Sequence, residues 1–520
     1  MSTVFPPLRS LKVKEGLPRV FVDFGLVQLS MIIALAVCVF YHAAVGQIAQ
    51  ASTVIQIVRR YYFHDFWALS LVFPLVFLLN GFYTRSRSYT SRYKALVVLR
   101  GVGLSILVFL AANYLLFREA LAPRSVTLVF CCLVMFSLTA VRYGKAVIQS
   151  HFEIRPRTAQ VNGASLGPVL VVGGAGYIGS IVVRQLLQEG RRVRVLDNLL
   201  YGDAAIADLR GQPDFELITG DCRNIQNVVK AVKGVDAIID LAAIVGDPAC
   251  EEDRQMALEI NYAATRMLIE IAKGNGVGRF IFASSCSVYG ATDEVMTELS
   301  EVAPISLYAQ TKIDSERVLL QARSESFHPT ILRLATVFGQ SYRPRFDLVV
   351  NLLSAKSHQE GIITIYNGDQ WRPFIHVRDV AAGLIAALKA PIDSVSGEVF
   401  NLGDTRMNCT LASLGEKIRL AFPATRVEPL ENSDRRNYRV SFEKAARLIG
   451  FQCAISIEEG ITEIKRFLEH GGAVDYRDAL YHNQRYLHSV GSPTANATDT
   501  NVMAAFAAAP APASAIPGNS

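Results

Sequence analysis

Cysteine is sparse in this sequence, and the few cysteines are not grouped. The eight cysteines are scattered along 520 residues, with no CxxC pair and no Cys/His cluster at metal-ligand spacing. This pattern predicts neither a disulfide framework nor a zinc site. Unpaired thiols suit a reducing cytosol, and we expect no metal in the functional site.

Acidic residues are almost missing from residues 1–150, which hold 4 Asp and Glu against 15 Lys and Arg. The whole chain holds 46 Asp and Glu and 52 Lys and Arg, so the other 370 residues hold 42 acidic residues against 37 basic ones. The basic charges flank long apolar runs and form no continuous stripe, which argues against a nucleic-acid partner. We therefore expect a basic membrane domain followed by a mildly acidic globular domain.

Four apolar runs in residues 1–150 approach the ~20 residues that a helix needs to cross a bilayer; they cover 24–44, 66–83, 95–117 and 125–141. Basic residues gather before the first run, between the second and third, and after the fourth, which places both ends in the cytoplasm. A cleaved signal peptide is the alternative for the first run, but no small-residue cleavage site precedes the other three. We expect an all-α four-helix transmembrane domain in a bacterial inner membrane, with the rest of the chain in the cytoplasm.

A glycine-rich turn opens the globular part, after residues 151–167, which we expect to be a linker. The apolar run Pro168–Val172 leads directly into Gly173-Gly-Ala-Gly176-Tyr-Ile-Gly179, and a helical pattern follows. Such glycines let the backbone approach a pyrophosphate and let the helix pack on the strand, while the helix N-terminus favours the anion. A second strand ends in Asp197, whose carboxylate can accept both ribose hydroxyls of NAD. This order of elements predicts an NAD site.

Further apolar runs alternate with helical stretches downstream, at 215–218, 237–242, 279–283 and 330–334. This alternation predicts an α/β fold, a Rossmann-type doubly wound parallel sheet spanning 168–475. We expect a small C-terminal substrate-binding subdomain mainly in 340–475. The Ala- and Pro-rich segment 489–520 has little to bury and is expected to be disordered.

A tyrosine and a lysine four residues apart, Tyr308 and Lys312, share one face of a predicted helix. A nearby ammonium and a positive nicotinamide ring both favour the phenolate, so Tyr308 could remove a hydroxyl proton as hydride leaves the adjacent carbon. The hydroxyls of Ser284-Ser-Cys-Ser287 follow a predicted strand, at the edge of the sheet where ligands bind. The YxxxK spacing is common by itself, and its meaning depends on these neighbours.

Together these motifs resemble the extended short-chain dehydrogenase/reductase family, in particular its nucleotide-sugar epimerases and dehydratases, over about residues 168–470. The resemblance implies that Tyr308 is the base, that Lys312 holds the nicotinamide ribose and that Ser285 binds the reacting hydroxyl. It implies NAD as cofactor, held by Gly173, Gly176, Tyr177, Ile178, Gly179, Asp197, Asn198, Asp221, Cys222, Leu241, Ala242, Ala243 and Lys312. The residues implied for the sugar nucleotide are Ser287, Thr336, Asn351, Arg372 and Arg436.

The departures from the family pattern bear on the reaction. The dehydratases of this family resemble one another in carrying an Asp-Glu pair after the catalytic hydroxyl. The corresponding positions in this chain are Cys286 and Ser287. Elimination is therefore not expected, and oxidation and reduction at a ring carbon, most often C4, remain. A 4-epimerase that keeps its NAD is favoured over a 4-ketoreductase, which consumes reduced cofactor. Asp240 stands where the family often has His, and Thr336 stands where it usually has Asn.

The first 150 residues have a resemblance of their own. Gly81-Phe-Tyr83, Tyr89 and Arg92-Tyr-Lys94 look like the four-span domain of bacterial polysaccharide-synthesis enzymes. This resemblance implies work on surface-polysaccharide precursors, on a nucleotide-diphosphate sugar or a lipid-linked sugar, beside glycosyltransferases. The resemblance to the extended short-chain dehydrogenases implies a homodimer. The non-enzyme alternative is an NAD-sensing regulator, which the retention of Ser285, Tyr308 and Lys312 disfavours.

Overall fold

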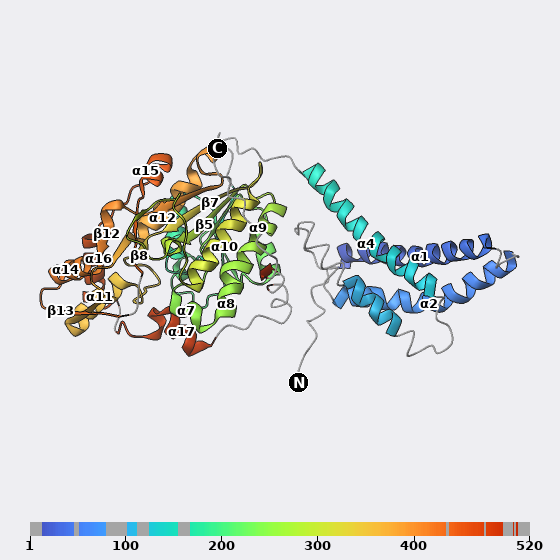
Figure 1. Cartoon of the computed structure of the whole chain (residues 1–520), viewed down its shortest axis with the longest axis horizontal. Helices are drawn as coiled ribbons and strands as arrows, with labels where there is room; N and C mark the ends of the chain where they lie inside the picture. The colour runs from blue at the N-terminus through green and yellow to red at the C-terminus, as the bar shows by residue number, and fades with distance from the viewer. Residues whose placement is uncertain are drawn as a thin grey trace. The chain divides into compact units, whose positions relative to one another are not determined.

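The computed structural model describes residues 13–45, 51–79, 101–111, 124–153, 167–432, 436–472 and 475–491, with 503, 506 and 507. The chain divides into two compact units, Met1–Arg157 and Thr158–Ser520 (Figure 1). Most of the predicted linker and of the predicted disordered tail lies outside the described residues. Parts of the second and third predicted spans, with the motif at 81–94, lie outside them as well.

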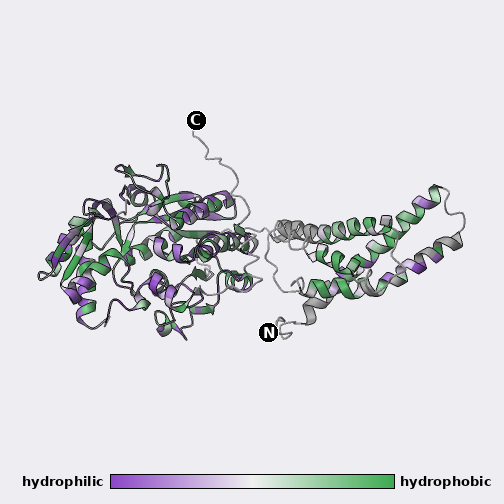
Figure 2. Ribbon diagram, turned by 60° about the horizontal axis from the view of Figure 1, so that its bottom comes forward, coloured by the Kyte–Doolittle hydropathy of each residue, from purple (hydrophilic) through white to green (hydrophobic). Residues whose placement is uncertain are grey.

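The first unit is helical. It contains α1 (Val13–Ala44), α2 (Ala51–Leu79), a helix at Gly101–Ala111 and α4 (Arg124–Glu153). Phe73, Phe109 and Phe130 pack together, with ring centroids 5.9–6.3 Å apart. Hydrophobic residues predominate in these helices (Figure 2), and Phe40 and Phe136 are largely exposed.

A single helix among the described residues, at Val20–Ala44, is long and apolar enough to cross a membrane. The helices at Gly101–Ala111 and Ser125–Val141 are apolar but shorter. The helical character of this unit agrees with the sequence, but four membrane spans are not confirmed. The four-span domain therefore stays a prediction.

The second unit is built on a parallel sheet of seven strands, in the order β11-β7-β5-β4-β1-β2-β3. Its central strands are buried on both faces, which is why they are continuous apolar runs in the sequence. The predicted Rossmann-type sheet is confirmed, with an additional edge strand, β11. The strands are β1 (Val169–Val172), β2 (Val193–Asp197), β3 (Phe215–Thr219), β4 (Ala237–Asp240), β5 (Arg279–Ser285), β7 (His328–Leu334) and β11 (Glu398–Leu402).

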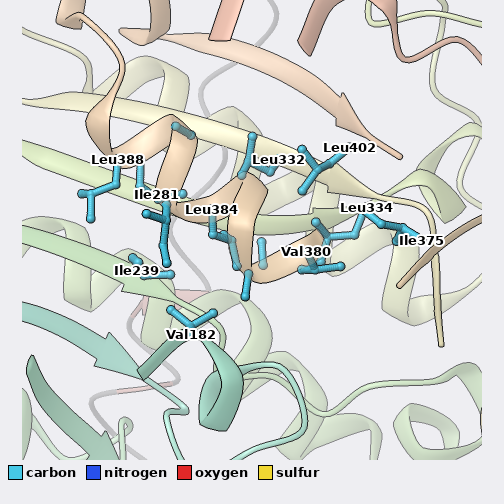
Figure 3. Packing of buried hydrophobic residues seen from close by; sticks show 14 of the residues in the cluster. Val182, Ile239, Ile281, Leu332, Leu334, Ile375, Val380, Leu384, Leu388 and Leu402 are labelled. Carbon is cyan, nitrogen blue, oxygen red and sulfur yellow. The ribbon is translucent and has the colours of Figure 1, made fainter. Parts of the chain in front are cut away.

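Helices cover both faces of this sheet. On one face α5 (Gly179–Gln188) packs beside α12 (Val377–Lys389), and on the other α9 (Thr265–Gly274) lies between α6 (Ile225–Val232) and α10 (Leu307–Ala322). Figure 3 shows the packing on the first face, where leucines and valines of α12 and α5 contact the strands. Shorter helices in this part are α7 (Asp247–Glu252), α8 (Arg254–Leu258) and α13 (Ile392–Val395).

A smaller subdomain with its own hydrophobic core follows the sheet. Its strands form one three-stranded sheet, β12-β10-β8, and two pairs, β13-β9 and β14-β6. The strands are β6 (Val295–Met296), β8 (Thr336–Phe338), β9 (Ile362–Tyr366), β10 (Trp371–His376), β12 (Asn408–Thr410), β13 (Arg426–Leu430) and β14 (Arg439–Val440). The helices are α11 (Val349–Glu360), α14 (Leu411–Ala421), α15 (Glu443–Ile449) and α16 (Ile457–Glu469).

Another helix, α17 (Asn483–Val490), returns to the first part of the sheet and contacts α7. Its Leu487 is buried in a cluster with Ile244, Cys250 and Met256, against which Tyr308 also packs. The chain beyond residue 475 thus reaches the edge of the sheet where the strands end.

Candidate active site

The glycine turn joins β1 to α5 and lies against the segment that follows β4. Gly173 has a φ of +82°, and a Cβ at this position would lie 2.9 Å from the amide nitrogen of Ala242. A Cβ on Gly179 would lie 2.7 Å from Cα of Gly174. Only glycine permits this close backbone packing. The predicted turn therefore exists, and the structure brings Leu241–Ala243 against it.

Asp197 ends β2 beside this turn, as the sequence predicts. Its two carboxylate oxygens accept hydrogen bonds from the amides of Ala175 at 2.9 Å and Leu199 at 2.8 Å. These bonds fix the carboxylate while each oxygen keeps a lone pair for a ligand hydroxyl. The burial of Asp197 raises the pKa of its carboxyl. Asn198 forms a local turn by accepting the amide of Leu200.

Asp221 and Cys222 follow β3 at the same edge of the sheet. The carboxylate of Asp221 forms an ion pair with Arg223 at 2.8 Å, and the same guanidinium contacts Glu259 at 3.0 Å. Burial raises the pKa of the Cys222 thiol, so this cysteine contributes as a neutral, apolar side chain. The ion pair with Arg223 was not expected from the sequence.

The proposed catalytic side chains meet at the end of β5. Tyr308 lies in the first turn of α10, which Ser306 caps by accepting the amide of Ala309. Its phenol is a hydrogen-bond partner of Ser285, and the hydroxyl of Ser287 donates to the Ser285 oxygen at 2.9 Å. The structure thus brings Tyr308, Ser285 and Ser287 together.

Lys312 is buried one helical turn further along α10. Its ammonium donates to the carbonyl of Ala283 at 2.8 Å and lies 5.8 Å from the ring centroid of Tyr308. Burial raises the pKa of Tyr308, with the hydrogen bond to Ser285 opposing that shift. The YxxxK spacing predicts that Lys312 favours the phenolate. In the structure, desolvation is the largest effect on the pKa of the phenol.

Asp240, at the end of β4, is the carboxylate that acts on Lys312. It is buried, it accepts a hydrogen bond from the hydroxyl of Thr265 at 3.2 Å, and burial raises its pKa to about 6. Burial lowers the pKa of Lys312 to about 8, and the charge of Asp240 opposes that shift. The sequence showed Asp240 only as a departure from the family pattern, without this partner.

Replacing Asp240 by Asn is expected to move the alkaline limb of kcat/KM to lower pH. The Lys312 ammonium is lost as pH rises through about 8, and without the carboxylate its pKa falls further. The profile is measured from about pH 6 to about pH 10, where the limb reports the free enzyme. Thr265→Val, which keeps the carboxylate and removes one hydrogen bond, serves as the control. An unchanged limb in Asp240→Asn contradicts the coupling.

A buried polar network lies directly behind the catalytic serines. Glu316 of α10 forms an ion pair with Arg333 of β7 at 2.7 Å and accepts a hydrogen bond from Ser284. Arg333 also donates to the phenol oxygen of Tyr289 at 3.0 Å, and Tyr289 donates to Asn401 at 2.7 Å. No local sequence pattern indicates these partners, which come from distant segments of the chain.

The predicted substrate residues fall into three groups, of which Ser287 lies with the catalytic serine. Arg372 is buried and donates to the carbonyl of Arg436, while Arg436 forms an ion pair with Asp247 at 3.0 Å. Thr336 lies nearby as a hydrogen-bond partner of Tyr438, and Tyr438 faces the Arg372 guanidinium. These residues lie at one boundary between the sheet and the subdomain.

Asn351 lies apart from Arg372 and Arg436. Its amide donates to the carbonyls of Gly339 and Arg345 at 3.2 and 2.9 Å, and its oxygen accepts the amide of Gly339. The phenol of Tyr177 donates to the same Gly339 carbonyl at 2.6 Å. In this structure Asn351 and Tyr177 therefore hold the 339–345 segment against the glycine turn.

This fold and this site define a Rossmann-type dinucleotide-binding protein with the Tyr/Lys pair of the short-chain dehydrogenases. Residues 169–403 match the family described as the NAD dependent epimerase/dehydratase family. A UDP-glucose 4-epimerase from Lactobacillus helveticus is 30% identical over 254 residues, which cover 45% of this chain and 76% of the relative. The chain belongs to the NAD dependent epimerase/dehydratase family, and its cofactor is NAD.

Two further comparisons agree with this assignment. A UDP-glucuronate 4-epimerase from Thermodesulfobacterium geofontis (strain OPF15) is 29% identical over 317 residues, covering 57% of this chain and 94% of the relative. The structure of MoeE5 in complex with UDP-glucose and NAD matches with a TM-score of 0.52 and 28% identity, covering 59% of this chain and all of that one. These similarities concern the second unit.

Proposed function

We propose that the chain is an NAD-dependent 4-epimerase of a nucleotide-diphosphate sugar. The observation that carries the proposal is the meeting of Tyr308, Ser285 and Lys312 at the edge of the sheet beside the glycine turn. The close packing of Gly173 on Ala242 and the fixed carboxylate of Asp197 fit a dinucleotide at that edge. Bound NAD supplies a reversible acceptor for the hydride of a ring carbon.

The residues of this chain supply the proton chemistry. Ser285 holds the C4 hydroxyl of the sugar, and Tyr308 takes its proton while the C4–H bond breaks, which leaves a 4-keto sugar. Lys312, whose ammonium lies 5.8 Å from the centroid of the Tyr308 ring, places a positive charge beside the phenolate that forms. After the keto sugar turns, Tyr308 returns the proton to the same oxygen as hydride returns to the other face.

The environment of Cys286 argues against elimination. Its side chain is completely buried, its thiol donates to the carbonyl of Arg333 at 3.3 Å, and burial raises its pKa. A neutral thiol fixed in this way cannot protonate or deprotonate a sugar. The neighbouring Ser287 is already bonded to Ser285. Redox chemistry at one ring carbon is the reaction that this arrangement supports.

We further propose that residues 1–150 anchor the enzyme in a bacterial inner membrane, with the second unit in the cytoplasm. The apolar helix at Val20–Ala44, the exposed Phe40 and Phe136, and the basic flanks of the apolar runs support this placement. A role in surface polysaccharide synthesis, with glycosyltransferases as partners and a homodimer as the assembly, rests on the resemblance described above. A lipid-linked sugar is the alternative substrate.

The reaction is tested on the full chain purified in detergent. We expect extraction of the protein to release NAD, and we expect interconversion of one pair of C4 epimers among UDP-, GDP- and dTDP-sugars without added cofactor. Consumption of added NADH with a 4-keto sugar, in place of epimer interconversion, would identify a 4-ketoreductase. Retention of NAD without turnover of any nucleotide sugar or lipid-linked sugar would favour a regulatory protein.

A further inference from the structure

Arg343 is a buried cation without an anionic partner in the described part of the chain. Only 7% of its surface is exposed. One terminal nitrogen donates to the amide oxygen of Asn483 at 2.7 Å, and the guanidinium lies 3.5 Å from the ring centroid of Tyr201. Its Nε has no hydrogen-bond partner. A buried charge that forms no direct ion pair is costly unless a ligand supplies the pairing group.

The carboxylates near Arg343 do not form an ion pair with it. Asp347 is engaged by Arg345 through two bonds of 2.8 and 2.9 Å, and it also accepts the amide of Asn483. The oxygens of Asp197 are bonded to main-chain amides. Burial and the like charge of Arg345 lower the pKa of Arg343 to about 10, although Asp347 and Asp197 oppose the shift. Both carboxylates therefore act on Arg343 only from a distance, and neither forms an ion pair with it in the described part of the chain.

The neighbours of Arg343 indicate which site an anionic ligand of this guanidinium would occupy. Tyr201, which stacks on the guanidinium, follows the β2 carboxylate Asp197 by four residues. Asn483, which holds the guanidinium, also donates to the carbonyl of Val245 at 3.4 Å, in the segment that follows Ala243. The 339–345 segment itself is bonded to Tyr177 of the glycine turn. All three neighbours thus belong to the rim of the dinucleotide site.

Helix α17 holds this arrangement in place. Tyr486 of α17 packs on Tyr201 with ring centroids 5.1 Å apart, and His488 contacts Glu252 of α7 at 2.8 Å. Leu487 is buried in the cluster that includes Cys250. Because α17 binds both the loop after β2 and α7, it fixes Asn483, and through it Arg343, at the rim of the site.

We propose that Arg343 binds the diphosphate of the dinucleotide and that Asn483 of α17 positions its guanidinium. A planar guanidinium with an open Nε matches a phosphate oxygen, and the diphosphate would supply the direct anionic partner that Arg343 lacks among the described residues. The proposal depends on the NAD site and does not depend on which sugar reaction the enzyme performs. It gives helix α17 a function in cofactor binding.

The proposal is tested by binding measurements on the NAD-free full chain, with NAD, ADP, adenosine and UDP as probes. Arg343→Met is expected to weaken the binding of NAD and of ADP about 10- to 100-fold. The affinity for adenosine, which has no phosphate, is expected to stay unchanged. Arg343→Lys is expected to recover part of the loss because it keeps the charge. The control is Arg406→Met, at a largely exposed position. Equal losses for ADP and adenosine, or a loss confined to UDP, would overturn the proposal.

Asn483→Asp separates ligand binding from a purely structural role. The new carboxylate would pair with Arg343 and take the place of the phosphate. The NAD-free protein is then expected to melt at a higher temperature while its affinity for ADP falls. If Arg343 only supported the fold, the variant would not change stability and affinity in opposite directions. A lower melting temperature, or an unchanged affinity for ADP, would contradict the assignment.

Discussion

Replacing Tyr308 by Phe is expected to lower kcat for the nucleotide-sugar reaction by a factor of about 10²–10⁴, the usual contribution of a positioned acid or base. The ring stays in place, because it packs against the cluster around Cys250, and only the phenol oxygen is lost. Ser285 then has no partner that can accept the proton of the sugar hydroxyl. The loss is expected in kcat and not in NAD retention, since the substitution leaves the glycine turn and Asp197 unchanged.

The matched control for this prediction is Tyr366→Phe, which removes the same atom from a half-exposed residue of β9. Both variants are purified in detergent, their bound NAD is extracted, and turnover is compared per mole of bound cofactor. If Tyr308→Phe turned over at the wild-type rate, Tyr308 would not be the base of the reaction. If Tyr308→Phe lost its bound NAD and Tyr366→Phe kept it, the loss of turnover would reflect a disturbed cofactor site and not the loss of a base.

Replacing Glu316 by Gln is expected to lower the free energy of unfolding of the second unit by about 3–5 kcal/mol. Glu316 and Arg333 are both buried, with 4% and 7% of their side chains exposed. The substitution leaves the guanidinium of Arg333 without its counter-charge in a dry environment. It also disturbs β5, through the bond to Ser284, and thereby the serines of the site.

Asp203→Asn is the control for the Glu316 variant, because the ion pair of Asp203 with Arg210 is about half exposed on both sides. Exposed pairs contribute about 0–1 kcal/mol. Hydrogen exchange of the β5 and β7 amides in the full chain measures unfolding of the sheet in each variant. Similar, small losses for the two variants would show that the buried pair is not a major source of stability.

The regular part of the sheet could be predicted because its strands are local apolar runs. The central strands are buried on both faces, so each is a continuous hydrophobic segment between turns. The edge strand β11 was missed because Glu398 and Asn401 interrupt its apolar pattern. Asn401 is fully buried only because Tyr289 and Ser441 satisfy its amide, and such long-range partners leave no local signal.

The candidate site was predictable where one motif contains several functional groups. The glycine turn, Asp197 and the Tyr308/Lys312 pair are of this kind, and the fold brings them to one edge of the sheet. The action of Asp240 on Lys312 and the contact of Asn483 with Arg343 join residues from distant segments. The burial of Arg343 without an ion-pair partner among the described residues exists only in three dimensions.

Isotope tracing at C4 tests the central claim most directly, namely that hydride leaves and returns to one ring carbon while Tyr308 moves the proton. The nucleotide sugar that turns over is supplied with deuterium at C4, without added cofactor. We predict that the product epimer keeps the deuterium at C4 and that Tyr308→Phe forms almost none of it. Exchange of the label with solvent, or product formed at the normal rate by Tyr308→Phe, would contradict the account.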